Sequence, residues 1–521
     1  MKEMGRTIKK NGYLILFLYY IISFFLDRLI FDFDRLNVFN YVCIKIILLF
    51  VVFWLYYYLP RFNFLKTKFF LVYCVLFAVI FFVLYPGTWL GSDVFLIYEK
   101  AVTCDFYYHL NYLTTLFYIV SFMIIPLPVA PIILQILFSA SVFAYISQKT
   151  MLTFKFEKKF AWLMITPFIL FHSIFYILYP NRPILFGLIV LAIFVTLFCD
   201  FYKKPIITKL KMFLLVSMTA VVSIIRTEAI YLIIVVPMLI FFIYGLKSKY
   251  KKWGILKYIA LFLIPFLIVG APQKDYELFG QTLHERQSRN LPSYISPLSL
   301  MLVDDAANLS NEDVEAIDKV LSVDDLRKYS SFYDVPCIWR SENCIRNFDN
   351  EEYVSFRNSF ISVILKNKKL FFYSKLRVFL ASTTFVEPDH FTTFGIFDDD
   401  KGILDDTLRP LFDNRIRKNI YRLIEGKTGN EFVDLFYRLV NNILLPLSVI
   451  LISFAYFIYK KKAILAIICG TFMFGGVVVF FTAPAAYFMY YYFVFLWGWY
   501  LLVLGVIKLL SSSRRKKLRM V

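Results

Sequence analysis

Long apolar runs separated by short basic links dominate the chain. Representative runs cover residues 69–85, 160–179, 230–244 and 443–459. They approach or reach the ~20 residues that a helix needs to cross the hydrocarbon core of a bilayer. The pattern therefore predicts an all-α fold, a polytopic bundle of membrane-spanning helices.

The first apolar run begins at Tyr13 and is expected to be an anchor. It contains no small-residue cleavage site, and it continues into Asp27 and Arg28. A secretory signal peptide would end in such a site. We therefore interpret this run as a membrane-spanning segment.

Basic residues mark the expected cytoplasmic ends of the runs. Lys2–Lys10 places the amino terminus in the cytoplasm, because cytoplasmic loops carry an excess of lysine and arginine. Similar clusters lie at residues 61–68, 149–159, 203–211, 247–257, 460–462 and 514–517. With all of them inside, the expected spans are residues 13–31, 38–59, 69–85, 128–147, 160–179, 184–201, 211–225, 229–246, 255–270, 436–459, 463–482 and 486–509. The result is about twelve crossings with both termini cytoplasmic.

Residues 112–126 are left over by this assignment. Counting them as a full crossing would place the basic link at residues 149–159 outside. We therefore expect a re-entrant half-helix that dips into the bilayer and returns on the same side.

The assignment divides the chain into three parts. Residues 1–270 form a transmembrane core whose first external loop is residues 86–110, residues 271–432 form an external domain, and residues 433–521 form the last spans and a basic tail. Strand-like alternation is not sustained anywhere in the external domain, so this domain is expected to be mostly helical. Within it, Ser310 and Asp313 have the spacing of a helix-capping pair.

Composition narrows the class of protein. Hydrophobic residues make up 60% of the 521 residues and aromatic residues 20%, which excludes an ordinary soluble domain. The net charge of +20 comes from cations concentrated at the ends of apolar runs, so it indicates topology rather than nucleic-acid binding. The sequence contains no glycine-rich phosphate loop and no Cys/His cluster with metal-ligand spacing, and no cofactor is expected. Cys337 and Cys344 share the external segment and predict a disulfide in an oxidising compartment.

Three carboxylates and a histidine lie in the first external loop: Asp93, Glu99, Asp105 and His109. Acids beside a bilayer cost free energy unless they are solvated, paired or used. Asp93 could end a surface helix, and Glu99 and Asp105 could be solvated or could pair with a neighbouring lysine. Asp93 with either of the other acids could also hold a divalent ion, but the ligands would be few, and no metal site is predicted.

Several short motifs together resemble the GT-C superfamily of integral-membrane glycosyltransferases, most closely a group of bacterial members. In that group an early external loop reads Tyr-Pro-Gly, then an acid, then a His-Pro-like element. The counterparts here are Tyr85-Pro86-Gly87, Asp93 and His109, although Leu110 stands where the group has proline.

Later parts of the chain also resemble motifs of that group, although some of their residues differ from the motifs. Asn181-Arg182 and residues 226–229 occupy the places of a basic residue after a mid-chain span and of an Arg-x-x-Gly-like turn. Residues 292–297 look like the start of the external domain of that group. Each motif is short and degenerate, so the resemblance extends to the superfamily and not to a substrate.

The resemblance implies an enzyme of the bacterial cytoplasmic (inner) membrane that moves a sugar from a polyprenyl-phosphate carrier to a glycan or lipid-linked acceptor, with inversion at the anomeric carbon. Asp93 would be the general base, with Glu99 and Asp105 as the other catalytic candidates. The candidate substrate-binding residues are His109, Arg182, Arg226, Glu228, Arg286 and Arg289. The arginines among them would bind the phosphate of the carrier.

Each binding candidate also has an ordinary structural interpretation. Arg182 and Arg226 lie at span ends, where arginines commonly extend to the interface. Glu228 could simply pair with Arg226, whereas Arg286 and Arg289 could be surface charges. His109 could contact lipid headgroups.

Two other functions fit parts of the sequence. A polysaccharide or O-antigen polymerase would use the same carrier on the same side of the membrane. A flippase or transporter for lipid-linked glycans would favour ionisable groups at mid-membrane depth and paired halves, whereas this chain keeps most charges at span ends.

Overall fold

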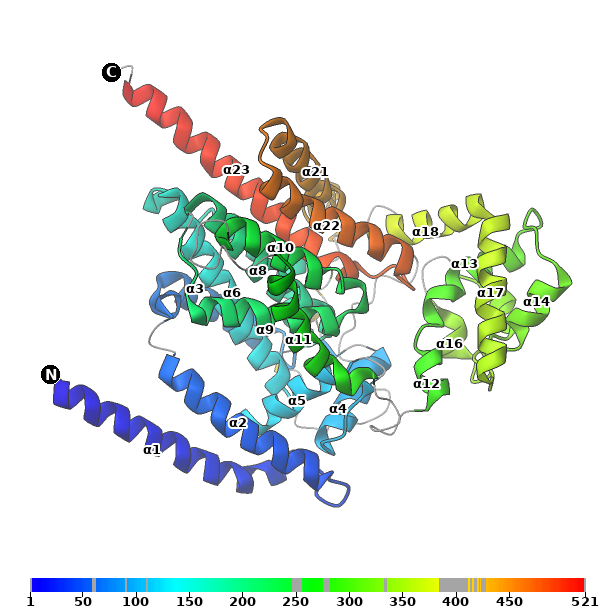
Figure 1. The fold of residues 1–521 in the computed structure, drawn as a ribbon, viewed down its shortest axis with the longest axis horizontal. Helices are drawn as coiled ribbons and strands as arrows, with labels where there is room; N and C mark the ends of the chain where they lie inside the picture. Colours follow the sequence, from blue (N-terminus) through cyan, green and yellow to red (C-terminus); the bar gives the residue numbers. More distant parts are fainter. Residues whose placement is uncertain are drawn as a thin grey trace. The chain divides into compact units, whose positions relative to one another are not determined.

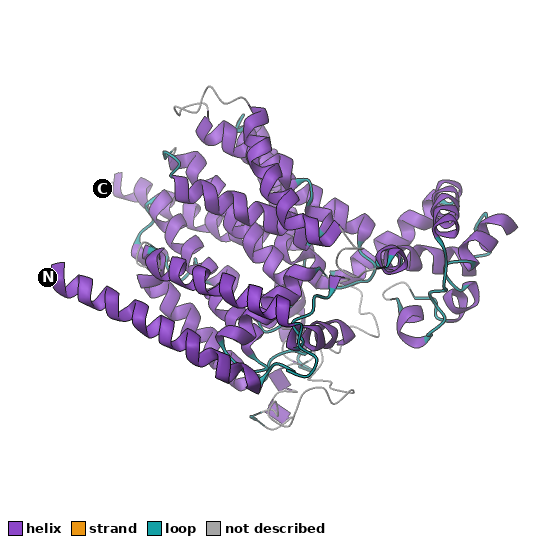
Figure 2. Cartoon of the chain, turned by 60° about the horizontal axis from the view of Figure 1, so that its bottom comes forward, coloured by secondary structure: helices purple, strands orange, loops and turns teal. Residues whose placement is uncertain are grey.

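The computed structural model describes residues 2–58, 62–89, 91–108, 111–203, 205–245, 255–274, 282–331, 335–383 and 428–519, with a few positions between 411 and 422. Over these residues the fold is built from α-helices and 3₁₀ turns (Figure 2), and the one β-type pairing among them is an isolated bridge between Leu321 and Ile345. The predicted all-α class is confirmed.

The chain divides into two compact units. Unit 1 contains residues 1–205, 393–434 and 503–521, and unit 2 contains residues 206–392 and 435–502. The helices of unit 1 are α1 (Lys2–Leu26), α2 (Val38–Tyr58), α3 (Lys68–Val83), α4 (Gly91–Val102), α5 (Tyr112–Ile124), α6 (Ala130–Phe154), α7 (Phe171–Ile177) and α8 (Arg182–Lys203).

Unit 2 holds the remaining helices (Figure 1). They are α9 (Lys209–Ile225), α10 (Leu232–Tyr244), α11 (Ile255–Lys274), α12 (Leu283–Ser288), α13 (Pro292–Val303), α14 (Asn311–Asp318), α15 (Val323–Lys328), α16 (Pro336–Arg340), α17 (Asn350–Lys366), α18 (Lys368–Ser382), α21 (Leu444–Tyr459) and α22 (Ala463–Thr482). Two helices, α20 (Glu431–Val440) and α23 (Tyr492–Arg519), contribute residues to both units.

Eight helices of the described residues are long and apolar enough to span a bilayer, or nine if the bent pair α20 and α21 counts as one span. This confirms a polytopic helical membrane protein with fewer full-length spans than the twelve expected. Two expected spans, at residues 69–85 and 211–225, form the shorter helices α3 and α9, of 16 and 17 residues. Residues 112–126 contain the short helix α5, and its entry into the bilayer stays a prediction.

The prediction of one continuous helix over residues 160–179 is wrong. The segment is broken into the 3₁₀ turns Lys158–Phe160 and Thr166–Phe168, followed by the short α7. Pro167 lies inside the second turn and has no backbone N–H with which to continue a helix. The apolar run alone carried no sign of how strongly this proline would interrupt it.

The broken segment nevertheless packs along α6. The hydroxyl of Ser147 donates to the carbonyl of Met164 (3.4 Å). Three turns earlier on α6, Gln135 Nε2 donates to the carbonyls of Tyr176, Ile177 and Tyr179 at 3.1, 2.9 and 2.8 Å. Gln135 thus adds a side-chain donor at the irregular end of α7, where the carbonyls of Tyr176 and Tyr179 also accept the backbone N–H groups of Tyr179 and Asn181. Irregular backbone is tolerated at membrane depth where it is buried against protein in this way.

A buried ion pair joins the first two helices of unit 1. Asp27 begins the 3₁₀ turn after α1, and its Oδ2 lies 2.5 Å from Lys45 Nζ on α2. Both side chains are 1% exposed. The hydroxyl of Tyr41 donates to the same carboxylate oxygen, and the rings of Tyr20, Phe24 and Tyr41 surround the ammonium.

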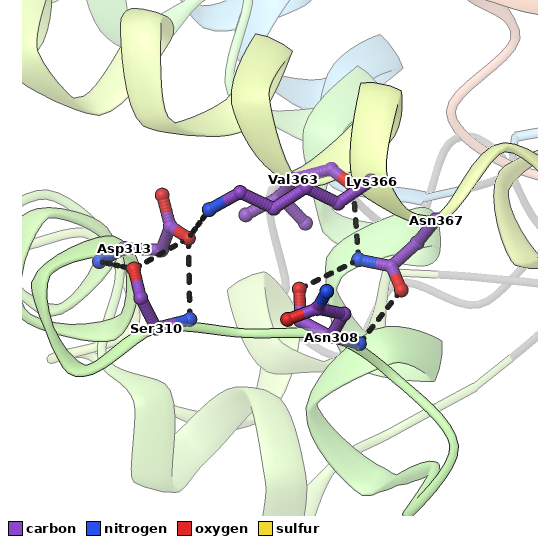
Figure 3. Close-up of polar contacts among 6 residues, drawn as sticks. All are labelled: Asn308, Ser310, Asp313, Val363, Lys366 and Asn367. Carbon is purple, nitrogen blue, oxygen red and sulfur yellow. Dashed lines mark hydrogen bonds and ion pairs between the residues drawn. The ribbon is translucent and has the colours of Figure 1, made fainter.

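Helices α12 to α18 gather around a separate apolar core in unit 2. Cys337 and Cys344 form the predicted disulfide within it. Figure 3 shows how α14 begins: Ser310 and Asp313 form the predicted capping box, and Lys366 Nζ of α17 lies 2.6 Å from Asp313 Oδ2. Asn367 adds hydrogen bonds to the backbone of Asn308 at 2.8 and 3.0 Å.

Lys375 of α18 connects this helical group to α22. The side chain is 1% exposed, and its ammonium donates to the carbonyls of Ser293 (3.4 Å) and Ala483 (3.3 Å). Both carbonyls lack a helical donor. Pro297, four residues after Ser293, has no N–H, and Ala483 ends α22. Lys375 therefore holds α13 and the end of α22 together, and the helix dipole of α22 favours a cation there.

Burial of Lys375 predicts a pH-dependent stability. It lowers the pKa of Lys375 from 10.5 to about 8. The unfolded chain consequently binds more protons between these values, so the free energy of unfolding should rise between pH 8 and pH 10, by up to ~3 kcal/mol over the whole interval. Thermal unfolding in detergent at several pH values should show this rise in the wild type and not in Lys375→Met. Parallel curves for the two proteins would contradict it.

Candidate functional site

A tight Pro-Gly turn begins the loop at residues 86–110, which the sequence predicts to be external. Gly87 has a φ of +94°, a conformation that side-chain-bearing residues rarely adopt. A Cβ at this position would lie 2.6 Å from Ile132 Cδ1 and 3.1 Å from the carbonyl oxygen of Leu178. Glycine is therefore required both for the turn and for its close approach to α6 and α7.

The turn is fixed against the end of the broken segment. The backbone N–H of Thr88 donates to the carbonyl of Leu178 (3.1 Å), and the indole N–H of Trp89 donates to the carbonyl of Pro86 (3.2 Å). Tyr118 of α5 donates to the carbonyl of Pro180 (2.8 Å). The Pro-Gly turn, α5, α6 and the start of α8 thus meet at one end of unit 1.

Asp93 lies in the first turn of α4, directly after this turn. The side chain is partly buried, and burial raises the pKa of its carboxyl, whereas the positive charge of Arg182 lowers it. Arg182 is the first residue of α8. The structure therefore brings together two residues that are far apart in the sequence and that were both predicted site residues.

Asn181 fixes the backbone from which Arg182 extends. It is buried, its Oδ1 accepts a hydrogen bond from the backbone N–H of Arg182 (2.7 Å), and its Nδ2 donates to the hydroxyl of Tyr179 (3.0 Å). The start of α8 is thereby capped by a side chain. A carboxylate with a raised pKa within electrostatic range of a guanidinium can take up a proton while the cation stabilises a nearby anion.

The pair should control the pH dependence of any reaction in which Asp93 acts as a base. Activity should fall as the pH drops through the raised pKa of Asp93. Arg182→Gln removes the charge that lowers this pKa, so the acidic limb of the pH–rate profile should move to higher pH. Arg182→Lys retains a positive charge and should keep the limb near its wild-type position. An unmoved limb in Arg182→Gln would show that the two groups do not interact.

The other two candidate catalytic acids lie apart from this pair. Glu99 is exposed on α4, six residues after Asp93 and therefore on another face of the helix. Asp105 accepts a hydrogen bond from Asn37 Nδ2 (3.1 Å), and the neighbouring Cys104 carbonyl accepts one from Asn40 (3.0 Å). These contacts attach the α1–α2 link to the end of α4, which gives Asp105 a structural role. His109 lies outside the described residues.

Arg226 is committed to an internal ion pair in unit 2. Only 5% of its side chain is exposed, and its Nη2 and Nε lie 2.9 and 3.4 Å from the two carboxylate oxygens of Glu228. Its Nη1 also donates to the carbonyl of Tyr490 (3.4 Å). The ordinary interpretation of Glu228, as the partner of Arg226, is confirmed. A bidentate partner already occupies the fork that a phosphate would need.

Arg286 and Arg289 belong to the short helix α12 and its end. Arg286 is exposed and Arg289 is partly exposed. They lie in unit 2, as Arg226 does, so Arg182 is the one candidate arginine that shares a unit with Asp93. Over the described residues, no group of three or more His, Cys, Asp or Glu side chains could hold a metal ion.

Sequence reasoning missed the residue that organises this end of unit 1. Gln135 was part of an apolar run, and it is fully buried. The available signal was a glutamine inside a predicted span. A side-chain amide in a membrane costs free energy unless it forms hydrogen bonds with neighbouring segments.

Comparison of the chain with models of protein families, with curated proteins and with solved structures gives no match. The fold and the site by themselves define a multi-pass helical membrane protein with an acid and an arginine within electrostatic range of each other in its first unit.

Proposed function

We propose that this protein is a membrane glycosyltransferase that moves a sugar from a polyprenyl-phosphate carrier to the hydroxyl of a glycan or lipid-linked acceptor. The observation that carries the proposal is that Arg182 lies within electrostatic range of Asp93, a carboxylate that burial keeps partly away from water. A partly buried carboxylate whose pKa is raised suits a general base, and a neighbouring guanidinium suits a phosphate leaving group.

The proposed reaction assigns one task to each member of the pair. Asp93 accepts the proton of the acceptor hydroxyl as its oxygen forms a bond to the anomeric carbon of the sugar. The bond from that carbon to the carrier phosphate breaks at the same time, and the polyprenyl phosphate leaves with the electron pair. Arg182 stabilises the negative charge that grows on the departing phosphate. Attack from the face opposite the phosphate inverts the anomeric carbon.

The proposal places the reaction at the outer face of a bacterial cytoplasmic membrane. It follows from the basic clusters, which assign the first external loop and the start of α8 to the same, non-cytoplasmic side. Polyprenyl-phosphate sugars offer their phosphates at the membrane surface, at the depth where span ends lie. The raised pKa supports a site of limited water access, which strengthens the electrostatic interactions within it.

Deletion of the protein, followed by mass spectrometry of the cell-surface glycans, tests the proposal. Loss of one sugar or branch with the remaining chain intact is the expected result, and re-expression should restore it. Uniformly short chains would instead indicate a polymerase, and accumulation of carrier-linked sugar on the cytoplasmic side would indicate a flippase. Unchanged glycans in a verified deletion strain would contradict the proposal.

A further inference from the structure

Helix α20 is strongly amphipathic and lies directly before α21. Its apolar side chains are more exposed than is usual for large hydrophobic residues: Phe432 is 78% exposed, Leu435 57%, Phe436 56% and Leu439 49%. These positions have the i, i+3, i+4, i+7 spacing of a single helical face. The charged residues Glu431, Asp434 and Arg438 lie to one side of this stripe, with Asp434 farthest from it.

The helix has a defined start. Asn430 Oδ1 accepts hydrogen bonds from the backbone N–H groups of Phe432 (3.1 Å) and Val433 (3.2 Å). The carboxylate of Asp434 accepts from the N–H and hydroxyl of Thr428 at 2.8 and 2.7 Å. An N-terminal cap and an internal acid thus stabilise α20 through its polar side alone, and leave the apolar face free to contact something else.

Three surroundings would suit an exposed apolar stripe: hydrocarbon, the lipid headgroup boundary or protein. The charged face argues against hydrocarbon, because three charged groups within eight residues are costly there. The combined length of α20 and α21 also argues against placing α20 in hydrocarbon. From Glu431 to Tyr459 the pair α20 and α21 would extend ~43 Å as one helix, well beyond the ~30 Å hydrocarbon core, whereas the part from Val440 alone covers it.

Continuity with α21 favours lipid over protein. α21 carries exposed apolar side chains along its length, including Leu451 (52%) and Ile452 (67%), as expected for a helix that faces lipid. α20 meets it at a 41° bend. We propose that α20 lies in the headgroup layer of the bilayer, with Phe432, Leu435, Phe436 and Leu439 inserted at the boundary with the acyl chains.

Site-specific fluorescence tests this placement without reference to catalysis. The five free cysteines are first replaced, and the Cys337–Cys344 disulfide is kept. Single cysteines at Phe432 and Phe436, or at Glu431 and Arg438 as polar-face controls, are then labelled with an environment-sensitive NBD probe. The full chain is reconstituted in phosphatidylcholine nanodiscs that contain lipids with a doxyl quencher at acyl carbon 5 or carbon 12.

The expected result is a blue-shifted emission at Phe432 and Phe436, quenched more by the carbon-5 label than by the carbon-12 label, with water-like emission at Glu431 and Arg438. Water-like emission at all four positions would overturn the proposal. Blue-shifted emission that neither lipid quenches would show that protein covers the face. Strongest quenching by the carbon-12 label at all four positions would show that α20 is part of a span. None of these outcomes depends on whether the protein transfers sugar.

Discussion

Asp93→Asn should lower the rate of sugar transfer by ~10²- to 10⁴-fold, the usual effect of losing a positioned base. The substitution keeps the shape of the side chain and removes its negative charge and its capacity to accept a proton at neutral pH. The measurement is transfer by membranes that contain equal amounts of each protein, with the polyprenyl-phosphate sugar at saturation.

Asp324→Asn is the matched control, because Asp324 is an exposed acid in the helical group of unit 2. It should transfer sugar at the wild-type rate. Arg182→Gln should raise the KM for the donor as well as move the acidic limb, whereas saturating donor cannot rescue Asp93→Asn. Near-normal transfer by a well-expressed Asp93→Asn protein would remove Asp93 from the mechanism and redirect the search to the exposed Glu99.

Asp27→Leu should destabilise the protein by ~3–5 kcal/mol, because it leaves the buried Lys45 ammonium without its carboxylate. Asp27→Leu combined with Lys45→Met should regain most of that loss, since a buried ion pair replaced by apolar side chains of similar size is often neutral. Chemical or thermal unfolding in detergent measures both effects, and the double-mutant cycle isolates the interaction.

An exposed pair in the same link provides the comparison. Arg35 Nε lies 3.9 Å from Asp32 Oδ2, with side chains 83% and 41% exposed. Asp32→Ala should change the free energy of unfolding by less than ~1 kcal/mol, because solvent screens such pairs. Equal effects of Asp27→Leu and Asp32→Ala would show that the α1–α2 contact is not tightly packed in the membrane.

Most helices could be predicted because a long apolar run has few alternatives in a bilayer. The capping box at Ser310 and the disulfide at Cys337 and Cys344 also followed from local spacing. Pro167 carried a sequence signal for the break in residues 160–179, but the backbone path after the break could not be predicted, because it involves hydrogen bonds from Gln135 on another helix. Average hydropathy carries no information about such partners.

The candidate site also has a part that could be predicted from the sequence and a part that could not. Asp93 and Arg182 were identified by their places in the loop pattern and by the family resemblance, and the structure puts their charges within interaction range. Charge alone could not separate Arg182 from Arg226. Their difference is tertiary, because Glu228 lies against the guanidinium of Arg226 and Asn181 supports the backbone of Arg182.

The irregular path of residues 160–179 also bears on biogenesis. During synthesis this segment leaves the ribosome after α6, and the Gln135 side chain of α6 donates to three carbonyls at the end of the segment. These three hydrogen bonds form only once α6 and the segment lie side by side, so we expect the two to complete their packing together. The turn before Asp93 is bonded to the same segment through Leu178, so we expect the end of unit 1 that holds Asp93 to become ordered after α6 and this segment have packed.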